Sequence, residues 1–205
     1  IIMVGDSRTY LLAQYLFPVL QGDYPAITNY DHPVTYGNHR IIFDCARGAT
    51  IYNFTSNMPL GQLLDNLLKV HPGAYAFLWV GVNNVASPNG IVATFYRYLE
   101  LAQKNPQVNF IIFSIPGVDE YKSLRYHNAN NILISKYNSY MKSMVAYYHP
   151  VVPNLNYVNF MNEANPLFTI DNVDIRPFMD DQGLHFNAEA CKYFFSKMLQ
   201  FLPDN

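Results

Sequence analysis

A serine near the start of the chain lies where a hydroxyl could be activated as a nucleophile. Ser7 follows the apolar run 1–4 and the pair Gly5-Asp6, and apolar residues then recur three and four positions apart. This pattern predicts a strand, a tight turn and a helix. The free N–H groups at the start of such a helix favour negative charge, so an oxyanion could form there. The alternative is that Asp6 and Ser7 only cap the helix.

A nucleophilic serine needs a base within hydrogen-bond reach and a third group that orients the base. Among the six histidines, His185 has the most distinctive setting. It follows Asp180 and Asp181 closely, and Asn187 just after it is a typical helix cap. We therefore expect a carboxylate and an imidazole on one short loop, held by the last helix. The alternative is a lone structural histidine.

Two further residues could donate hydrogen bonds to a developing oxyanion. Gly48 has no side chain, so a substrate could approach its backbone N–H closely. Asn83 places an amide at the end of an apolar strand, where burying a polar side chain is costly unless it forms hydrogen bonds. Taken alone, Gly48 would be an ordinary turn glycine and Asn83 a strand-ending cap. Their order along the chain relative to Ser7 and His185 favours an oxyanion hole.

The predicted elements bring these residues to one edge of a sheet. Strands alternate with helices, which implies a parallel sheet covered by helices on both faces, with the site at the carboxyl ends of the strands. The turns at 5–7, 47–49 and 81–84 all fall at that edge, whereas 21–40 and 162–184 are expected to be long loops that shape specificity. We predict strands at 1–4, 41–45, 75–80, 109–115 and 157–160, and helices from residue 8 and over 59–70, 91–104, 130–148 and 188–202.

In this order and on these elements, four short blocks resemble the SGNH hydrolases, also called GDSL esterases and lipases. The blocks are Gly5-Asp6-Ser7-Arg8, Gly48, Gly81-Val82-Asn83-Asn84 and Asp181-Gln182-Gly183-Leu184-His185. The GDSR form of the first block looks like a bacterial branch of the superfamily. The resemblance covers almost the whole chain and implies one domain over 1–205. The implied fold class is α/β, a flavodoxin-like three-layer sandwich with a five-stranded parallel sheet.

The resemblance also implies roles for individual residues. Ser7 would be the nucleophile and His185 the base of an acyl-ester chemistry that needs no metal or other cofactor. The Ser7 and Gly48 N–H groups, together with the Asn83 amide, would form the oxyanion hole.

Three positions depart from the family pattern. Arg8 stands where many members have a small or apolar residue, and we expect it to pair with a carboxylate on the first helix or a loop. Asn84 replaces the usual aspartate. Gln182 occupies the position three residues before His185 at which the family normally has aspartate. We expect the loop to bulge so that Asp181 orients the imidazole; otherwise a backbone carbonyl would do so.

Composition limits the partners. With a net charge of -2 and only 14% charged residues, the chain has no electrostatic footprint for nucleic acid or an anionic membrane, and no apolar run approaches the length of a membrane span. Cys45 and Cys191 match no metal site, and we favour two buried thiols over a disulfide. The chain opens directly in a strand, so we expect a trimmed leader and an extracellular or cell-surface protein.

These observations predict a serine esterase that acts on a small-molecule or glycan ester. We favour a short acyl group, acetyl above all, because the sheet edge is open and the sequence has no long apolar lid for a fatty chain. We favour a carbohydrate because aromatic residues near the connecting turns could stack on sugars, although we expect Trp79 to be a core residue. The alternatives are an O-acetyltransferase that uses the same site and a catalytically silent relative that binds glycans. The aromatic residues are Tyr36, Tyr52, Trp79 and Tyr121.

Overall fold

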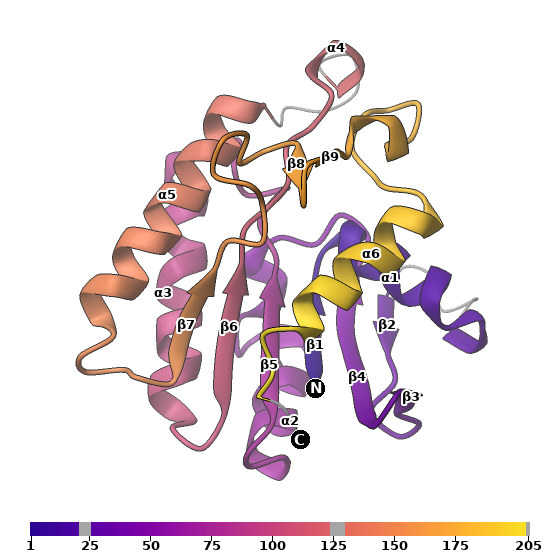
Figure 1. The fold of residues 1–205 in the computed structure, drawn as a ribbon. Helices are drawn as coiled ribbons and strands as arrows, with labels where there is room; N and C mark the ends of the chain where they lie inside the picture. The colour runs from indigo at the N-terminus through magenta and orange to yellow at the C-terminus, as the bar shows by residue number, and fades with distance from the viewer. Residues whose placement is uncertain (21–25, 124–129, 204–205) are drawn as a thin grey trace.

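The computed structural model, which describes residues 1–20, 26–123 and 130–203, has a central sheet with helices on both faces (Figure 1). Five of its strands are parallel and lie in the order β4-β1-β5-β6-β7. This is the flavodoxin-like order, so the predicted fold class is confirmed. The five strands are β1 (Ile2–Gly5), β4 (His39–Ala46), β5 (Tyr75–Trp79), β6 (Asn109–Phe113) and β7 (Leu155–Val158).

The sheet is wider than the five predicted strands. The short strands β2 (Ala26–Thr28) and β3 (Val34–Tyr36) pair antiparallel with β4 and bring the sheet to seven strands. Both arise in the connection 21–40, where we predicted no regular structure. Three-residue strands are too short to produce a clear alternation, and the length of β4 lets both pair along it. Residues 21–25 of this connection lie outside the described part of the chain.

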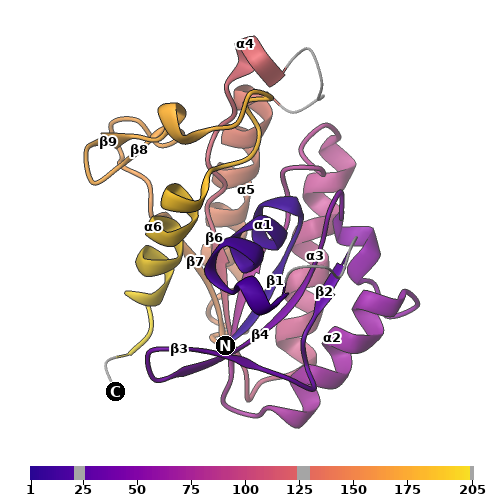
Figure 2. The same ribbon diagram turned by 90° about the vertical axis from the view of Figure 1, so that its right-hand side faces the viewer.

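The helices form a layer on each face of the sheet (Figure 2). One layer contains α1 and α6, whose side chains share a core cluster, and the other contains α2, α3 and α5. The first helix is shorter than its apolar pattern suggested, because Pro18 follows its end and leaves Val19 80% exposed. The helices are α1 (Ser7–Leu16), α2 (Pro59–Val70), α3 (Pro88–Lys104), α5 (Asn131–Tyr148) and α6 (Ala188–Leu199).

Shorter elements complete the structure. Around the carboxyl ends of the parallel strands, above the sheet in Figure 1, lie the small helix α4 and the hairpin β8–β9. The hairpin lies within 162–184, which we predicted to be loop. These elements are α4 (Glu120–Ser123), β8 (Thr169–Ile170), β9 (Val173–Asp174) and the 3-10 helices η1 (Pro18–Leu20), η2 (Ile51–Phe54) and η3 (Arg176–Phe178).

The two core clusters follow from the pleat of the strands. Alternate residues of β5 point to opposite faces: Phe77 and Trp79 join the cluster under α1 and α6, whereas Ala76 and Leu78 join the cluster under α2, α3 and α5. Both faces are covered, which explains why the central strands read as continuous apolar runs. Trp79 is 3% exposed and is a core residue, as predicted.

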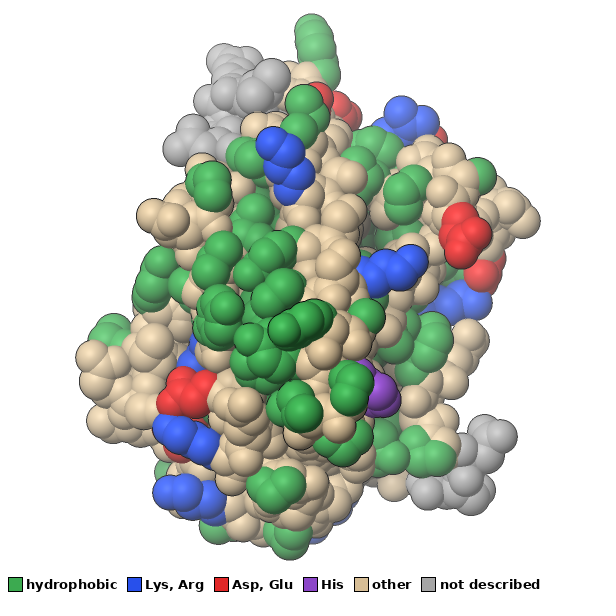
Figure 3. Space-filling model, turned by 90° about the vertical axis from the view of Figure 1, so that its left-hand side faces the viewer, with side chains coloured by type: hydrophobic (Ala, Val, Ile, Leu, Met, Phe, Trp, Pro, Cys, Tyr) green, Lys and Arg blue, Asp and Glu red, His purple; other side chains and the backbone are tan. Residues whose placement is uncertain are grey.

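The outer face of α3 and α5 is unusually apolar (Figure 3). Exposed side chains there include Val92, Tyr96 and Tyr147, with exposed fractions between 40% and 75%. Within the described ranges, no helix has the length and apolar character to cross a bilayer.

The register of the sheet positions the candidate site. Gly5, the last residue of β1, is the Cα partner of Cys45 in β4 and of Trp79 in β5. The turns that follow these three strands therefore lie side by side at the carboxyl edge. They carry Ser7, Gly48 and Asn83.

Candidate active site

A continuous hydrogen-bonded chain of three side chains connects the two ends of the sequence. The Ser7 Oγ lies 2.9 Å from Nε2 of His185, and Nδ1 of the same ring lies 3.1 Å from Oδ2 of Asp180. This is the relation between a serine, its base and the carboxylate that orients the base. Ser7 is 5% exposed, so it lies just below the molecular surface.

This carboxylate lies on a tight hairpin and belongs to a different aspartate from the one predicted. In residues 178–187, hereafter the His185 hairpin, the Asp180 N–H donates to the His185 carbonyl at 2.8 Å, and the Gly183 N–H donates back to the Asp180 carbonyl at 2.9 Å. Asp180 and His185 thus face each other across the hairpin. Asp181 falls at the exposed turn. The prediction that Asp181 orients His185 is therefore wrong, and Asp180 has that place.

The Asp180 carboxylate is held on both oxygens. Its Oδ1 accepts the backbone N–H groups of Leu184 and His185 at 3.1 and 3.2 Å, while Oδ2 faces the imidazole. Burial alone would raise the pKa of Asp180, but these hydrogen bonds outweigh burial and leave the pKa lowered. Asp180 is therefore ionised at neutral pH, as a group that stabilises an imidazolium must be.

The turn that carries Ser7 is built around Asp6 and Gly5. Asp6 caps α1 by accepting the Arg8 N–H at 3.0 Å, and its other oxygen accepts the N–H groups of Gly81 and Val82 at 3.1 and 3.2 Å. Asp6 thus caps the helix and ties the first turn to the third. A Cβ at Gly5 would lie 1.7 Å from the Thr9 hydroxyl, so this position requires glycine.

The predicted oxyanion donors lie on the two neighbouring turns, which are bonded to each other. Gly48 has a φ of +70° and open space where a Cβ would be. The Asn83 amide donates to the Ala49 carbonyl at 2.9 Å, which uses one of its two N–H groups and orients the other. Asn84, at the position where the family has aspartate, is 4% exposed and accepts the Ile51 N–H at 2.9 Å.

Among the described residues, Arg8 forms no hydrogen bond or ion pair with a carboxylate, which corrects the expectation from the sequence. Its side chain is 3% exposed, and its guanidinium donates to the carbonyls of Leu184, Pro116 and Gly117 at 3.1, 2.7 and 3.1 Å. Leu184 immediately precedes His185. Neither this position of Arg8 nor that of Asp180 was predicted from the sequence. The signals available were a charged residue beside the predicted nucleophile and two adjacent aspartates before Gly183.

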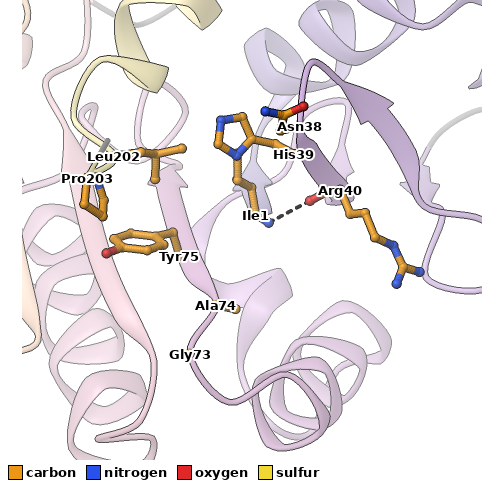
Figure 4. Close-up of a pocket in the computed structure, with 9 residues that line it drawn as sticks. All are labelled: Ile1, Asn38, His39, Arg40, Gly73, Ala74, Tyr75, Leu202 and Pro203. Carbon is orange, nitrogen blue, oxygen red and sulfur yellow. Dashed lines mark hydrogen bonds between the residues drawn. The ribbon is translucent and has the colours of Figure 1, made fainter. Parts of the chain in front are cut away.

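The structure also has a cavity that is separate from this site. A cavity of about 340 Å³ opens at the amino edge of the sheet, where the α-amino group of Ile1 donates to the Arg40 carbonyl at 2.8 Å (Figure 4). It contains none of the predicted site residues. Cys45 and Cys191 are buried free thiols, as favoured from the sequence. In the part of the chain that the structure describes, no three His, Cys, Asp or Glu side chains are grouped so that they could hold a metal ion.

Comparison with known proteins supports this fold at low sequence identity. No protein-family model and no curated protein matches the chain. Solved structures are similar. A lipase/acylhydrolase from Enterococcus faecalis is 17% identical, with a TM-score of 0.58 over 97% of this chain and 93% of its own.

Two further structures are similar to the same degree. A GDSL-like lipase from Bacteroides thetaiotaomicron is 16% identical, with a TM-score of 0.59 over 97% of this chain and 85% of its own. A member of the lipolytic protein G-D-S-L family from Veillonella parvula is 15% identical, with a TM-score of 0.54 over 98% and 96%. The chain therefore has the fold of these proteins.

Proposed function

We propose that the chain is a GDSL-type serine hydrolase that cleaves carboxylic esters through an acyl-enzyme on Ser7. The observation that carries the proposal is the chain of hydrogen bonds from Ser7 through His185 to Asp180, at 2.9 and 3.1 Å. The fold shared with lipases and acylhydrolases supports it.

The geometry is suited to two successive acyl transfers. The Ser7 Oγ attacks the ester carbonyl carbon as its proton passes to Nε2 of His185, and Asp180 stabilises the resulting imidazolium. When the tetrahedral intermediate collapses, the bond to the alcohol breaks and the alcohol takes that proton. A water molecule then attacks the acyl-enzyme with the same proton transfers, releasing the carboxylic acid and restoring the Ser7 hydroxyl.

The negative oxygen of each tetrahedral intermediate would be held by donors on three turns. These are the N–H groups of Ser7 and Gly48 and the side-chain amide of Asn83. All three turns are fixed before substrate arrives, because Asp6 and Asn83 hydrogen-bond them to one another. Donors fixed in advance need no reorganisation during the reaction, which is the main source of such stabilisation.

For the substrate we propose a short acyl group, acetyl above all, on a carbohydrate. Tyr52 supports a sugar, because it lies on η2 four residues after Gly48 and is 53% exposed. Tyr121, on α4, is 94% exposed. Tyr36 and Trp79 give no such support, since both rings pack in aromatic contacts with the core.

A pocket beside Gly48 offers space for the acyl group of the ester, and its size would limit the length of that group. It has a volume of about 280 Å³ and is lined mostly by apolar side chains, including Ala49, Met58 and Leu60. An ester series from acetyl to octanoyl tests the proposal: activity that is highest with acetyl supports it, and activity that rises toward octanoyl contradicts it. Acetate release from acetylated polysaccharides, with lysolipids left uncleaved, would support the carbohydrate.

The chemistry itself is tested by p-nitrophenyl acetate hydrolysis and by labelling with a fluorophosphonate. We expect turnover and labelling in the wild type, and loss of both in Ser7→Ala. Ser139→Ala, an exposed serine on α5, is the matched control and should keep both. A folded wild type without turnover or labelling would contradict the proposal. The alternative of a catalytically silent glycan binder rested on the displaced aspartate and on Asn84, and the Asp180 carboxylate facing His185 weighs against it.

A further inference from the structure

A buried arginine beside the nucleophile bridges the two loops that flank His185. Arg8 follows Ser7 in the first turn of α1 and is 3% exposed. Nε donates to the Leu184 carbonyl at 3.1 Å, while Nη1 and Nη2 donate to the carbonyls of Pro116 and Gly117 at 2.7 and 3.1 Å. One planar group thus holds three backbone oxygens from two segments far apart in sequence.

The two segments are the His185 hairpin and the turn that follows β6. They are joined directly by the Asp119 N–H, which donates to the Gly183 carbonyl at 2.9 Å. The guanidinium carbon also lies 5.0 Å from the centre of the Phe186 ring, immediately after His185. Arg8 therefore contacts the hairpin on both sides of His185, through a hydrogen bond to Leu184 and through the Phe186 ring.

The choice of arginine is informative because burying a cation is costly. In the described part of the chain, no carboxylate accepts a hydrogen bond from the guanidinium. Three carbonyls and the Phe186 ring replace water around the charge, and the nearby charges of Asp6 and Asp180 favour the cation. Well-packed apolar residues often match or exceed the stability of buried charged groups. A buried charge at this position is therefore better explained by geometry than by stability. The guanidinium donates from three nitrogens held in one rigid plane, so it can reach acceptors spread over two segments, whereas the three N–H donors of a lysine ammonium all radiate from one nitrogen on a flexible stem.

Resting on the proposed function, we propose that Arg8 is a positioning residue that fixes the His185 hairpin against Ser7. Ser7 and Arg8 are consecutive residues of one helical turn. The element that presents the nucleophile therefore also sets where its base sits. Arg8 acts through His185 and does not touch the substrate, so its loss should lower kcat and leave KM nearly unchanged.

The test compares Arg8→Lys with Arg97→Lys in p-nitrophenyl acetate hydrolysis. Arg97 is a matched control, because it is 5% exposed and donates to the Phe54 carbonyl, Asp65 and Glu100 at 2.8 to 3.0 Å, away from the site. We expect Arg8→Lys to lose about 10- to 100-fold in kcat with KM within about threefold, since small misplacements of catalytic groups have effects of this size. Arg97→Lys should lose stability without losing kcat per folded molecule.

A second variant and a second readout keep the inference testable if Arg8→Lys folds poorly. Phe186→Leu removes the ring under the guanidinium and should lower kcat to a smaller extent. In ¹H NMR of ¹⁵N-histidine-labelled protein, the His185 Nδ1–H signal bonded to Asp180 should be sharp in the wild type and Arg97→Lys, and broadened or lost in Arg8→Lys. Unchanged kcat and an unchanged signal in the Arg8 variant would overturn the inference. An inactive wild type would refute the proposed function, and the NMR signal would still decide the role of Arg8.

Discussion

Asp180 and His185 face each other across the closing pair of a hairpin. The Asp180 N–H donates to the His185 carbonyl at 2.8 Å, and the Asp180 carboxylate meets the imidazole Nδ1 at 3.1 Å. The backbone pairing that closes the turn thus also brings the two side chains together. The aspartate that faces the histidine lies five residues before it here, whereas the aspartate lies three residues before the histidine in the family that the sequence resembles.

The first prediction separates the two adjacent aspartates. Asp180→Asn removes the charge that stabilises the imidazolium and the acceptor that orients the ring, so kcat for p-nitrophenyl acetate should fall by roughly 10² to 10⁴-fold. Asp181→Asn changes the same charge at an exposed position and should stay within about twofold of the wild type. A larger loss in Asp181→Asn than in Asp180→Asn would reverse the assignment.

The five parallel strands and the long helices were predictable because each has a strong local signal. The apolar run 75–80 predicted a strand buried on both faces, which is observed as β5 and ends one residue earlier, at Trp79. Pro59 at the start of a leucine-rich segment predicted α2 with its observed bounds. Strands β2 and β3 were not predictable, because each has only three residues and is stabilised by pairing with β4 rather than by its own pattern.

The site was predictable in part for a related reason. Ser7 follows a predicted strand, and His185 precedes a predicted helix. The order of these elements along the chain therefore suggested that the two residues meet. The partner of His185 depends on which way side chains point in a tight turn, and the sequence does not encode that directly. The acceptors of Arg8 are backbone carbonyls, which have no signature in the sequence.

The second prediction concerns the turn of the His185 hairpin. Gly183 has a φ of +67°, and a Cβ there would lie 2.7 Å from the Asp119 carbonyl oxygen. Gly183→Ala should therefore combine backbone strain with a steric clash, lowering Tm by several degrees and kcat by about tenfold or more as the hairpin shifts. Gly37→Ala is the control, because its φ is +57° but nothing lies within 4 Å. Equal losses of kcat in the two variants would argue against a role for the hairpin geometry.

The third prediction divides the adjacent Asn83 and Asn84 between catalysis and stability. Asn83→Ala removes a proposed oxyanion donor and should lower kcat by about 10² to 10³-fold. It also removes the hydrogen bond to the Ala49 carbonyl, which should lower the free energy of unfolding by about 1 kcal/mol. Asn84→Ala leaves the buried Ile51 N–H without its acceptor and should lower the free energy of unfolding by about 1 to 3 kcal/mol. Kinetics and thermal unfolding on both variants check this division. A loss of kcat confined to Asn84→Ala would contradict it.

The fourth prediction concerns a buried carboxyl on β4. Asp44 is fully buried, neither carboxyl oxygen has a hydrogen-bond partner in the described structure, and burial raises the pKa of Asp44 to about 8. Between pH 4 and pH 8 the folded protein keeps a proton that the unfolded chain has released, so this group makes stability fall as pH rises.

Asp44→Asn removes this titration and should therefore stabilise the protein increasingly from pH 4 to pH 8. A pKa shift of this size corresponds to a cost on the order of 5 kcal/mol at pH 8, so the gain in Tm there should be about 10 °C or more, with little change at pH 4. Thermal unfolding of both proteins across this range measures the effect. Asp181→Asn, which removes an exposed charge, controls for net charge and should follow the wild-type curve. A Tm difference between Asp44→Asn and the wild type that stays constant with pH would mean that Asp44 does not hold its proton in the folded protein.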